Sequence, residues 1–150
     1  MKKELKVSAI ENGTVIDHIP AHAALKVAQL LDLQNHVDLF SIASNLQSKS
    51  QGKKAIIKIS GKYLTGDEAN KIAIIAPDVT VNIIKNFEVT EKKKVELPKL
   101  LLKTVKCSNP NCITNHEAVT TKFHLAEKEP LRLKCHYCEH VFGTKDIELV

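Results

Sequence analysis

The chain has 150 residues and a formal net charge of +5, and 43% of its residues are hydrophobic. This length allows one ordinary domain or two small ones, each with a hydrophobic core. The sequence has no apolar run of about 18 residues and no apolar segment near its amino terminus, so we expect a cytoplasmic protein without a membrane span.

The first part of the chain alternates extended and helical patterns. Residues 5–19 read as extended on both sides of an Asn-Gly turn. Residues 21–33 carry apolar side chains at helical spacing, which predicts an amphipathic helix. Residues 37–43 and 55–59 are rich in apolar and β-branched side chains and predict two strands.

A second helix and further strands follow. Thr65 and Glu68 have the spacing of a capping box, and Pro77 ends the helix that they open. Residues 79–83 alternate as a strand, and residues 87–89 resume the extended pattern after a turn.

This order of elements, β-α-β-β-α-β with an extra strand, predicts an α+β fold. Two βαβ halves joined by a hairpin form the ferredoxin-like arrangement, an antiparallel sheet with both helices on one face. The other face of such a sheet stays open. We expect an open face or edge to receive a ligand or a second protomer.

Charge and proline mark a change in the chain near residue 95. Residues 90–98 contain Lys92, Lys93 and Lys94 and end in a proline, and we expect them to form a connector. The predicted domains are therefore residues 1–97 and residues 98–150.

The second domain holds all four cysteines of the chain, in two close pairs separated by 22 residues: Cys107 and Cys112, then Cys135 and Cys138. Paired cysteines with none left over predict a tetrahedral zinc site. Two disulfides or four unliganded thiols are the alternatives, but disulfides need an oxidising compartment, and unliganded cysteines would not be expected to fall into two close pairs. Four thiolates leave zinc no position for water, so the site should be structural and should hold together a small all-β domain.

Polar residues in the predicted strands are candidate ligand contacts, although none is specific alone. Asp17 and His18 end a strand and fit either a nucleotide or a solvated surface. Lys58 lies between two isoleucines, and we expect its side chain to point to water or to an anion. Asn82 lies within a predicted strand although asparagine is unfavourable in strands. We find no catalytic triad, glycine-rich phosphate loop or convincing pair of carboxylates, so an independent enzyme is not expected.

With these residues laid out, the chain resembles the regulatory chain of aspartate carbamoyltransferase along its whole length. Four segments carry the resemblance in the order of the family: residues 13–20 (GTVIDHIP), residues 76–82, residues 86–89 (NFEV) and the four cysteines. The resemblance implies a non-catalytic chain. Such chains form dimers that bridge catalytic trimers in pyrimidine biosynthesis. They bind ATP and CTP, with UTP alongside CTP in some members and a divalent ion between paired nucleotides in others, and their zinc domain docks on the catalytic chain.

Carried over by position, the resemblance also implies a nucleotide pocket. The base would lie against the first strand and a closing hairpin, the ribose on Asp17 and Lys58, and the phosphates near His18 and Lys92. The implied pocket residues are Val7, Ala9, Ile10, Val15, Asp17, His18, Lys58, Asn82, Ile84, Phe87, Val89 and Lys92. Ser8 and Phe87 replace a carboxylate and a tyrosine found in some members, which leaves the preference between ATP and CTP open.

A zinc-ribbon protein that binds nucleic acid is the alternative function. The paired cysteines and the positive charge favour it. The charge is spread over both domains, however, and the chain has only six aromatic residues, four Phe and two Tyr. A dispersed charge is more typical of a solvated surface than of a nucleic-acid footprint, so we expect no nucleic-acid partner.

Overall fold

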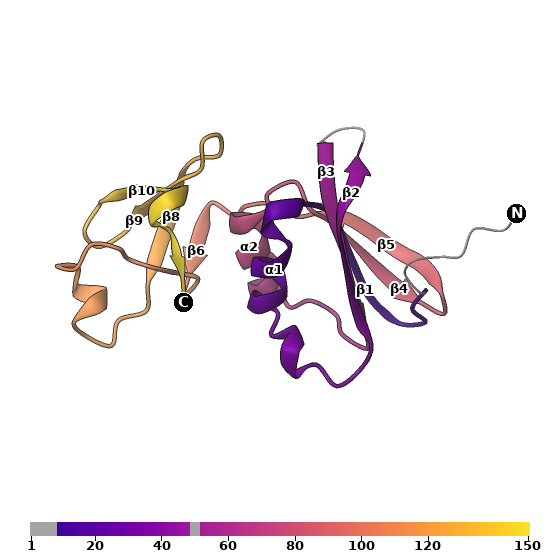
Figure 1. The fold of residues 1–150 in the computed structure, drawn as a ribbon. Helices are drawn as coiled ribbons and strands as arrows, with labels where there is room; N and C mark the ends of the chain where they lie inside the picture. Colours follow the sequence, from indigo (N-terminus) through magenta and orange to yellow (C-terminus); the bar gives the residue numbers. More distant parts are fainter. Residues whose placement is uncertain (1–8, 49–51) are drawn as a thin grey trace, which may run out of the picture. The chain divides into compact units, whose positions relative to one another are not determined.

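The computed structural model describes residues 9–48 and 52–150, in two compact units that divide between Val95 and Glu96 (Figure 1). The extended segment expected at residues 5–8, and with it the predicted pocket residue Val7, lies outside the described residues. Within the described ranges, no helix is long and apolar enough to cross a membrane.

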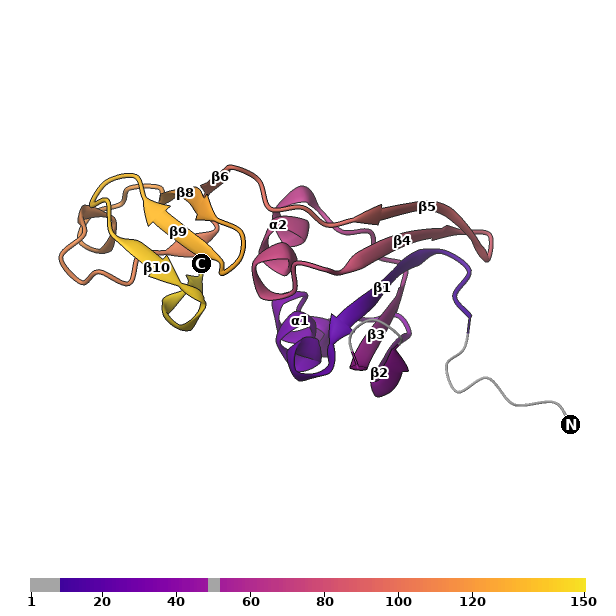
Figure 2. The same cartoon turned by 90° about the horizontal axis from the view of Figure 1, so that it is seen from above.

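The first unit has the predicted ferredoxin-like arrangement. Its sheet has the order β2-β3-β1-β4-β5, every neighbouring pair is antiparallel, and α1 and α2 lie on one face (Figures 1 and 2). The extra strand is β5, which forms a hairpin with β4. The elements are β1 (Gly13–Pro20), α1 (Ala24–Leu30), β2 (Phe40–Ser48), β3 (Gly52–Ser60), α2 (Gly66–Ile75), β4 (Thr80–Lys85) and β5 (Glu88–Lys94).

The core of this unit lies between the helices and one face of the sheet. Alternate residues of β3 are buried at Ala55, Ile57 and Ile59, so the residues between them point to the open face. Val27 of α1 and Ile72 of α2 are fully buried against this face. Each fully buried aliphatic side chain contributes about 1.5–3 kcal/mol, which explains why the strand pattern fixes one face inward.

The capping box predicted at the start of α2 is present. Thr65 Oγ1 accepts from the Glu68 N–H at 3.1 Å, and the Glu68 carboxylate accepts from the Thr65 N–H at 3.0 Å. Burial raises the pKa of Glu68, but the Thr65 N–H and the Lys62 ammonium outweigh it, so the pKa lies below its usual value. The carboxylate therefore stabilises the helix start in its charged form.

Two predicted segments differ from the structure at their ends. The expected helix over residues 21–33 is a 3-10 turn (Ala21–Ala23) followed by the shorter α1, because Asp32 adopts a left-handed φ of 53°. The expected strand over residues 37–43 starts only at Phe40 and runs to Ser48.

The connector predicted for residues 90–98 is wrong over its first half. Lys92, Lys93 and Lys94 belong to β5, which pairs with β4 as far as Thr80↔Lys94. β5 is an edge strand with all residues exposed, and lysines on an edge protect it from pairing with other chains. A run of charge therefore marked a sheet edge here, not a linker.

The second unit is small and consists of strands and 3-10 turns. Its larger sheet has the order β10-β9-β8-β6, and β11 pairs with β7. Leu101, Phe123 and Leu133 form its buried centre together with Cys107, Cys112 and Cys135. The strands are β6 (Leu100–Leu102), β7 (Val105–Lys106), β8 (Lys122–Glu127), β9 (Arg132–Cys135), β10 (Val141–Gly143) and β11 (Glu148–Leu149).

Candidate functional site

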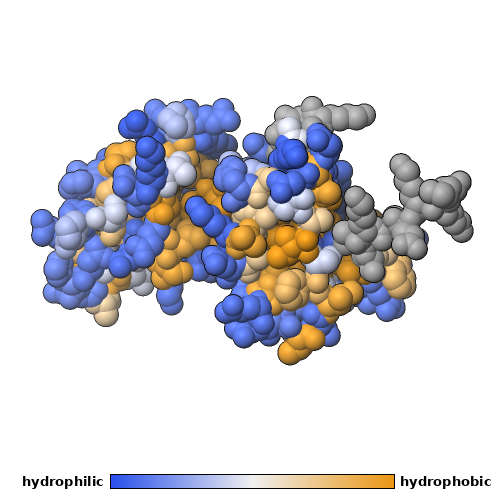
Figure 3. Space-filling model, in the orientation of Figure 1, coloured by the Kyte–Doolittle hydropathy of each residue, from blue (hydrophilic) through white to orange (hydrophobic). Residues whose placement is uncertain are grey.

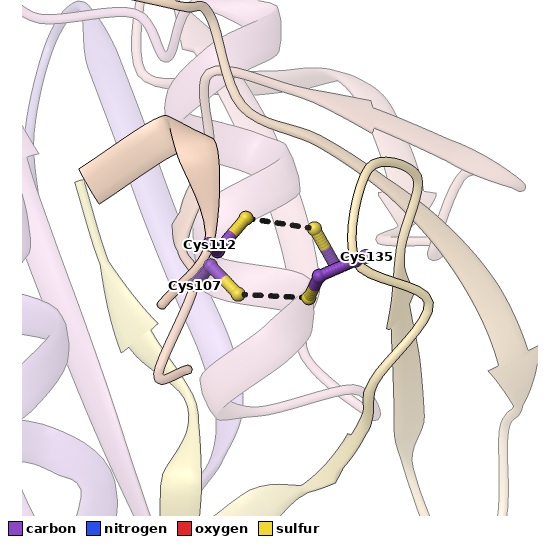
Figure 4. A group of neighbouring side chains, drawn as sticks. Cys107, Cys112 and Cys135 are labelled. Atoms are coloured by element: carbon purple, nitrogen blue, oxygen red, sulfur yellow. Dashed lines mark hydrogen bonds between the residues drawn. The ribbon is translucent and has the colours of Figure 1, made fainter. Parts of the chain in front are cut away.

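The four cysteines of the second unit converge on one point. Their sulfur atoms all lie within 4.8 Å of one another, with Cys107 Sγ 3.6 Å from Cys138 Sγ and Cys112 Sγ 3.8 Å from Cys135 Sγ (Figure 4). Four sulfurs around a tetrahedral zinc with Zn–S bonds of about 2.3 Å lie roughly 3.8 Å apart. The two closest approaches match this spacing, so the cluster is close to the geometry of a tetrathiolate metal site.

Two tight turns bring these cysteines together. Cys107 follows β7, and the Cys112 N–H donates to the Asn109 carbonyl at 3.1 Å, which closes the first turn. Cys135 ends β9, and its carbonyl accepts from the Glu139 N–H at 3.0 Å across the second turn. The sequence gap between the pairs contains β8 and β9, whose antiparallel pairing returns the chain to the first pair.

Polar side chains support the first pair. Thr114 Oγ1 donates to Cys112 Sγ at 3.2 Å. The Asn115 amide donates to the carbonyls of Cys107 and Asn109 at 2.9 and 2.8 Å. Hydrogen bonds of this kind orient metal ligands, and a donor to a thiolate also offsets its negative charge.

The thiols differ in how readily they ionise. Burial raises the pKa of Cys107 and of Cys135. Burial also raises the pKa of Cys138, but the His140 backbone N–H and the Asn109 side chain outweigh this effect and lower the pKa to about 6. Burial opposes ionisation of both Cys107 and Cys135, and a bound cation would remove this cost, so this donor set is suited to holding a metal ion.

A cleft of about 280 Å³ opens in the first unit. All of its lining residues belong to the nucleotide pocket predicted from the sequence: Ala9, Ile10, Val15, Lys58, Asn82, Ile84, Phe87 and Val89. The predicted residues Asp17, His18 and Lys92 do not line the cleft itself.

The register of the sheet explains why these residues meet. Lys58 of β3 pairs with Val15 of β1, Val15 with Asn82 of β4, and Asn82 with Lys92 of β5. Side chains at paired positions lie on the same face of a sheet. This row crosses four strands on the face opposite the helices, so Lys92 extends the cleft toward the β5 edge.

Asp17 and His18 lie at an irregularity in β1. The pairing with β3 shifts between Ile16 and Ile19, and His18 has a φ of 61°. Asp17 pairs with Thr80 of β4, two positions along from the Val15 row and hence on the same face. Bulges often re-aim side chains beside functional sites, and this one carries both predicted polar residues.

A two-residue turn closes the other end of the cleft. Asn86 and Phe87 join β4 to β5 with φ values of 51° and 66°. The Phe87 N–H donates to the Glu11 carbonyl at 2.9 Å, which ties the turn to the chain before β1. The Phe87 ring is 65% exposed although it belongs to the cleft lining, so it is available to a ligand.

Comparison with known proteins matches both units to one family. Residues 5–96 match the aspartate carbamoyltransferase regulatory chain, allosteric domain, and residues 101–148 match its metal binding domain. The chain belongs to the aspartate carbamoyltransferase regulatory chains. Regulatory chains from Pyrococcus horikoshii and Pyrococcus abyssi are 53% and 51% identical to it over 146 residues, and these spans cover 96% of each chain. That of Parabacteroides distasonis is 49% identical over 97% of this chain and 95% of its own.

As a member of this family, the protein is a non-catalytic subunit, and each of its two sites lies in one of the two family domains. The four cysteines fall within the metal binding domain, and the cleft falls within the allosteric domain. The regulatory chain also implies a catalytic chain as its partner.

Sequence reasoning missed two cations of the regulatory chain near the cleft. Lys54 lies four residues before Lys58 on β3, and its ammonium contacts Asp17 Oδ1 at 3.0 Å. Lys94 pairs with Thr80, in the row that contains Asp17. The alternation of side chains along β3 could have indicated Lys54, because Lys54 and Lys58 are four residues apart and lie on the same face. Lys94 was not expected near the cleft because its segment was predicted to be a connector.

Proposed function

We propose that this regulatory chain binds ATP and CTP in the cleft of its allosteric domain and passes the effect to catalytic trimers through a zinc-held domain. The row that runs from Lys58 through Val15 and Asn82 to Lys92 is the observation that carries the proposal. It places two cations beside the apolar lining of the cleft, which suits a base against the apolar side chains and a sugar and phosphates on the lysines.

Within the cleft, each part of a nucleotide has a chemical match. Ile10, Ile84 and Val89 offer apolar contact to a base, and the exposed Phe87 ring can close over it. Backbone groups beside the base would read its amino edge. This apolar end supports binding of both a purine and a pyrimidine.

The polar end of the cleft suits the ribose and the phosphates. Lys58 and Asp17 would bind the ribose hydroxyls, while Lys92 and His18 would face the phosphates. The Lys54 ammonium beside Asp17 adds positive charge to the same face. UTP would act alongside CTP, with a divalent ion between the phosphates of paired nucleotides.

Zinc is the metal that the cysteine cluster would hold. Four thiolates at tetrahedral spacing favour zinc over hard cations such as magnesium, and no position remains for catalytic water. The ion would supply only structural cross-linking. Because the unit has a small core, it would depend on this ion to keep the surface that docks on the catalytic chain.

A regulatory dimer would form through the allosteric domain. Leu25, Val37 and Leu39 are 71%, 95% and 63% exposed, and they lie on α1 and the segment before the edge strand β2. Figure 3 shows apolar side chains gathered over α1 and the segment that follows it. A groove of about 360 Å³ runs there between Leu25 and Phe40. Exposed apolar surface beside an open sheet edge supports pairing with a second copy of the chain. We expect this assembly to lie in the cytoplasm.

Linkage between binding and quaternary state would give the regulation. A nucleotide shifts the enzyme only by the difference between its affinities for the two states, about 1–3 kcal/mol in typical cases. The cleft and the metal unit supply the two ends of this coupling.

Calorimetry of nucleotide binding tests the cleft directly. Lys58→Ala and Lys92→Ala should each weaken ATP and CTP binding, because each removes a cation from the binding row. Lys93→Ala is the matched control, since its partner in β4 is the buried Val81 and its side chain points away from the row. If Lys58→Ala, Lys92→Ala and Lys93→Ala all bound ATP and CTP with the same affinity, the proposed pocket would be refuted.

A further inference from the structure

A pair of histidines in the metal binding domain lies outside the cysteine cluster. His124 Nε2 is 3.0 Å from His136 Nδ1, and the two rings have centroids 5.2 Å apart with a tilt of 40°. Both side chains are exposed. Neither belongs to the group of four sulfur ligands.

The sheet brings this pair together. His124 lies on β8 opposite Lys134 of β9, and the chain beyond β9 stays beside β8 because the His136 N–H donates to the Lys122 carbonyl at 2.8 Å. Position 136 is two residues beyond position 134, so both imidazoles lie on the same face of the sheet. The Tyr137 ring packs edge-on against His136, with centroids 5.2 Å apart.

The spacing of the two nitrogens suits a chelate. With metal–nitrogen bonds of 2.0–2.1 Å, two imidazole nitrogens on one ion lie roughly 2.9–3.4 Å apart. The observed 3.0 Å is already within this range. The proton of the shared hydrogen bond would move through solvent to the other nitrogen of its ring, and each ring would turn by roughly 40° so that its lone pair points at the ion instead of at the other nitrogen.

We propose that His124 and His136 form a second metal site, for a borderline divalent ion such as Zn²⁺, Ni²⁺ or Cu²⁺. Imidazole nitrogen is a favoured ligand for these ions, and because both rings are exposed, water can complete the coordination shell. Lys134 lies opposite His124, and Lys122 lies two residues before it on the same strand. Their positive charge makes this site weaker and more exchangeable than the cysteine cluster.

Titration of the full-length, zinc-loaded chain with Ni²⁺ at about pH 7.5, where free imidazoles are neutral, tests the proposal. The wild type should bind one Ni²⁺ without losing its cysteine-bound zinc. His124→Asn and His136→Asn should each lower the Ni²⁺ affinity by about tenfold or more, because a chelate that loses one arm loses its intramolecular advantage. His116→Asn is the control, since the His116 ring contacts the Pro110 carbonyl away from this pair.

Each possible result of the Ni²⁺ titration either supports the proposed site or overturns it. An affinity unchanged in His124→Asn, an equal loss in His116→Asn, or no Ni²⁺ bound to the wild type would overturn the proposal. His124→Asn carries the test by itself if His136→Asn disturbs the neighbouring Cys135, which retained zinc and an unchanged melting curve would reveal.

Discussion

At the residue scale, individual hydrogen bonds control how firmly the metal cluster is held. The Thr114 hydroxyl, which is not one of the four sulfur ligands, donates a hydrogen bond to the Cys112 sulfur. A tetrathiolate carries excess negative charge, and each donor to sulfur lowers the cost of keeping that charge buried.

Removing this donor should loosen the metal. We predict that Thr114→Val releases zinc to a chelator about tenfold faster than the wild type, whereas Thr114→Ser keeps the hydroxyl and releases it at nearly the wild-type rate. A colorimetric zinc chelator measures both rates. Equal rates for Val and wild type would show that the hydrogen bond does not support the site.

Phe87 combines local strain with a role in the cleft. Its left-handed φ of 66° is a conformation that glycine adopts without cost, and an Asn-Gly pair is the preferred two-residue hairpin turn. If this position served the turn alone, glycine would be the favoured residue. We propose that the bulky ring is kept because it lines the cleft.

Phe87→Gly should therefore change stability and binding in opposite directions. We expect the free energy of unfolding to rise by up to about 1 kcal/mol because the turn is relieved of strain. We expect nucleotide affinity to fall because the ring no longer covers the base. Urea denaturation and calorimetry measure the two effects, and a stabilised variant with full affinity would remove Phe87 from the site.

At the element scale, periodicity predicted most of the first unit, and local irregularities account for the rest. The apolar, β-branched run of residues 55–59 and the capping box of α2 are short-range patterns, and the structure confirms the strand and the cap. The register shift beside Asp17 and His18 depends on pairing between strands distant in sequence, so no local pattern reports it. The lysines of β5 were misread for the same reason, because their strand is defined by β4.

The start of α2 should respond to mutation and to pH. Thr65→Ala removes the acceptor for the Glu68 N–H and should cost about 1 kcal/mol of stability at neutral pH. Thr65→Ser retains the oxygen and serves as the control. Urea unfolding of the two variants would contradict the capping role if they lost equal stability.

The lowered pKa of Glu68 gives this contact a defined pH window. A carboxyl whose pKa is lower when folded contributes stability above its unfolded value of 4.5, and this contribution is lost as the pH falls through the folded value. Glu68→Gln should therefore flatten the acid-side slope of stability against pH. An unchanged slope in urea denaturation would show that Glu68 does not contribute there.

At the scale of the whole molecule, two units with different sources of stability are joined in one chain. The allosteric domain has a continuous core of buried aliphatic side chains, whereas the metal binding domain is small and includes its cysteines in its centre. The spacing of the cysteines predicted the metal cluster because ligand chemistry is local. The contact of Lys54 with Asp17 joins two strands distant in sequence, so alternation along β3 could indicate the face of Lys54 but not its partner.

Metal removal should affect these units separately. A thiol-reactive mercurial followed by a chelator should unfold the metal binding domain and free the catalytic trimers, while the allosteric domain still binds CTP. Sedimentation and calorimetry measure the two results. A complex that stays assembled after zinc loss would contradict the structural role of the ion.

The most direct test of the central claim is aspartate saturation of the complex reconstituted from catalytic trimers and Lys58→Ala or Lys92→Ala regulatory chains. We predict that the complex remains assembled and active while its responses to ATP and CTP fall sharply, and that Lys93→Ala chains give normal responses. Full responses from the Lys58→Ala and Lys92→Ala complexes would contradict it.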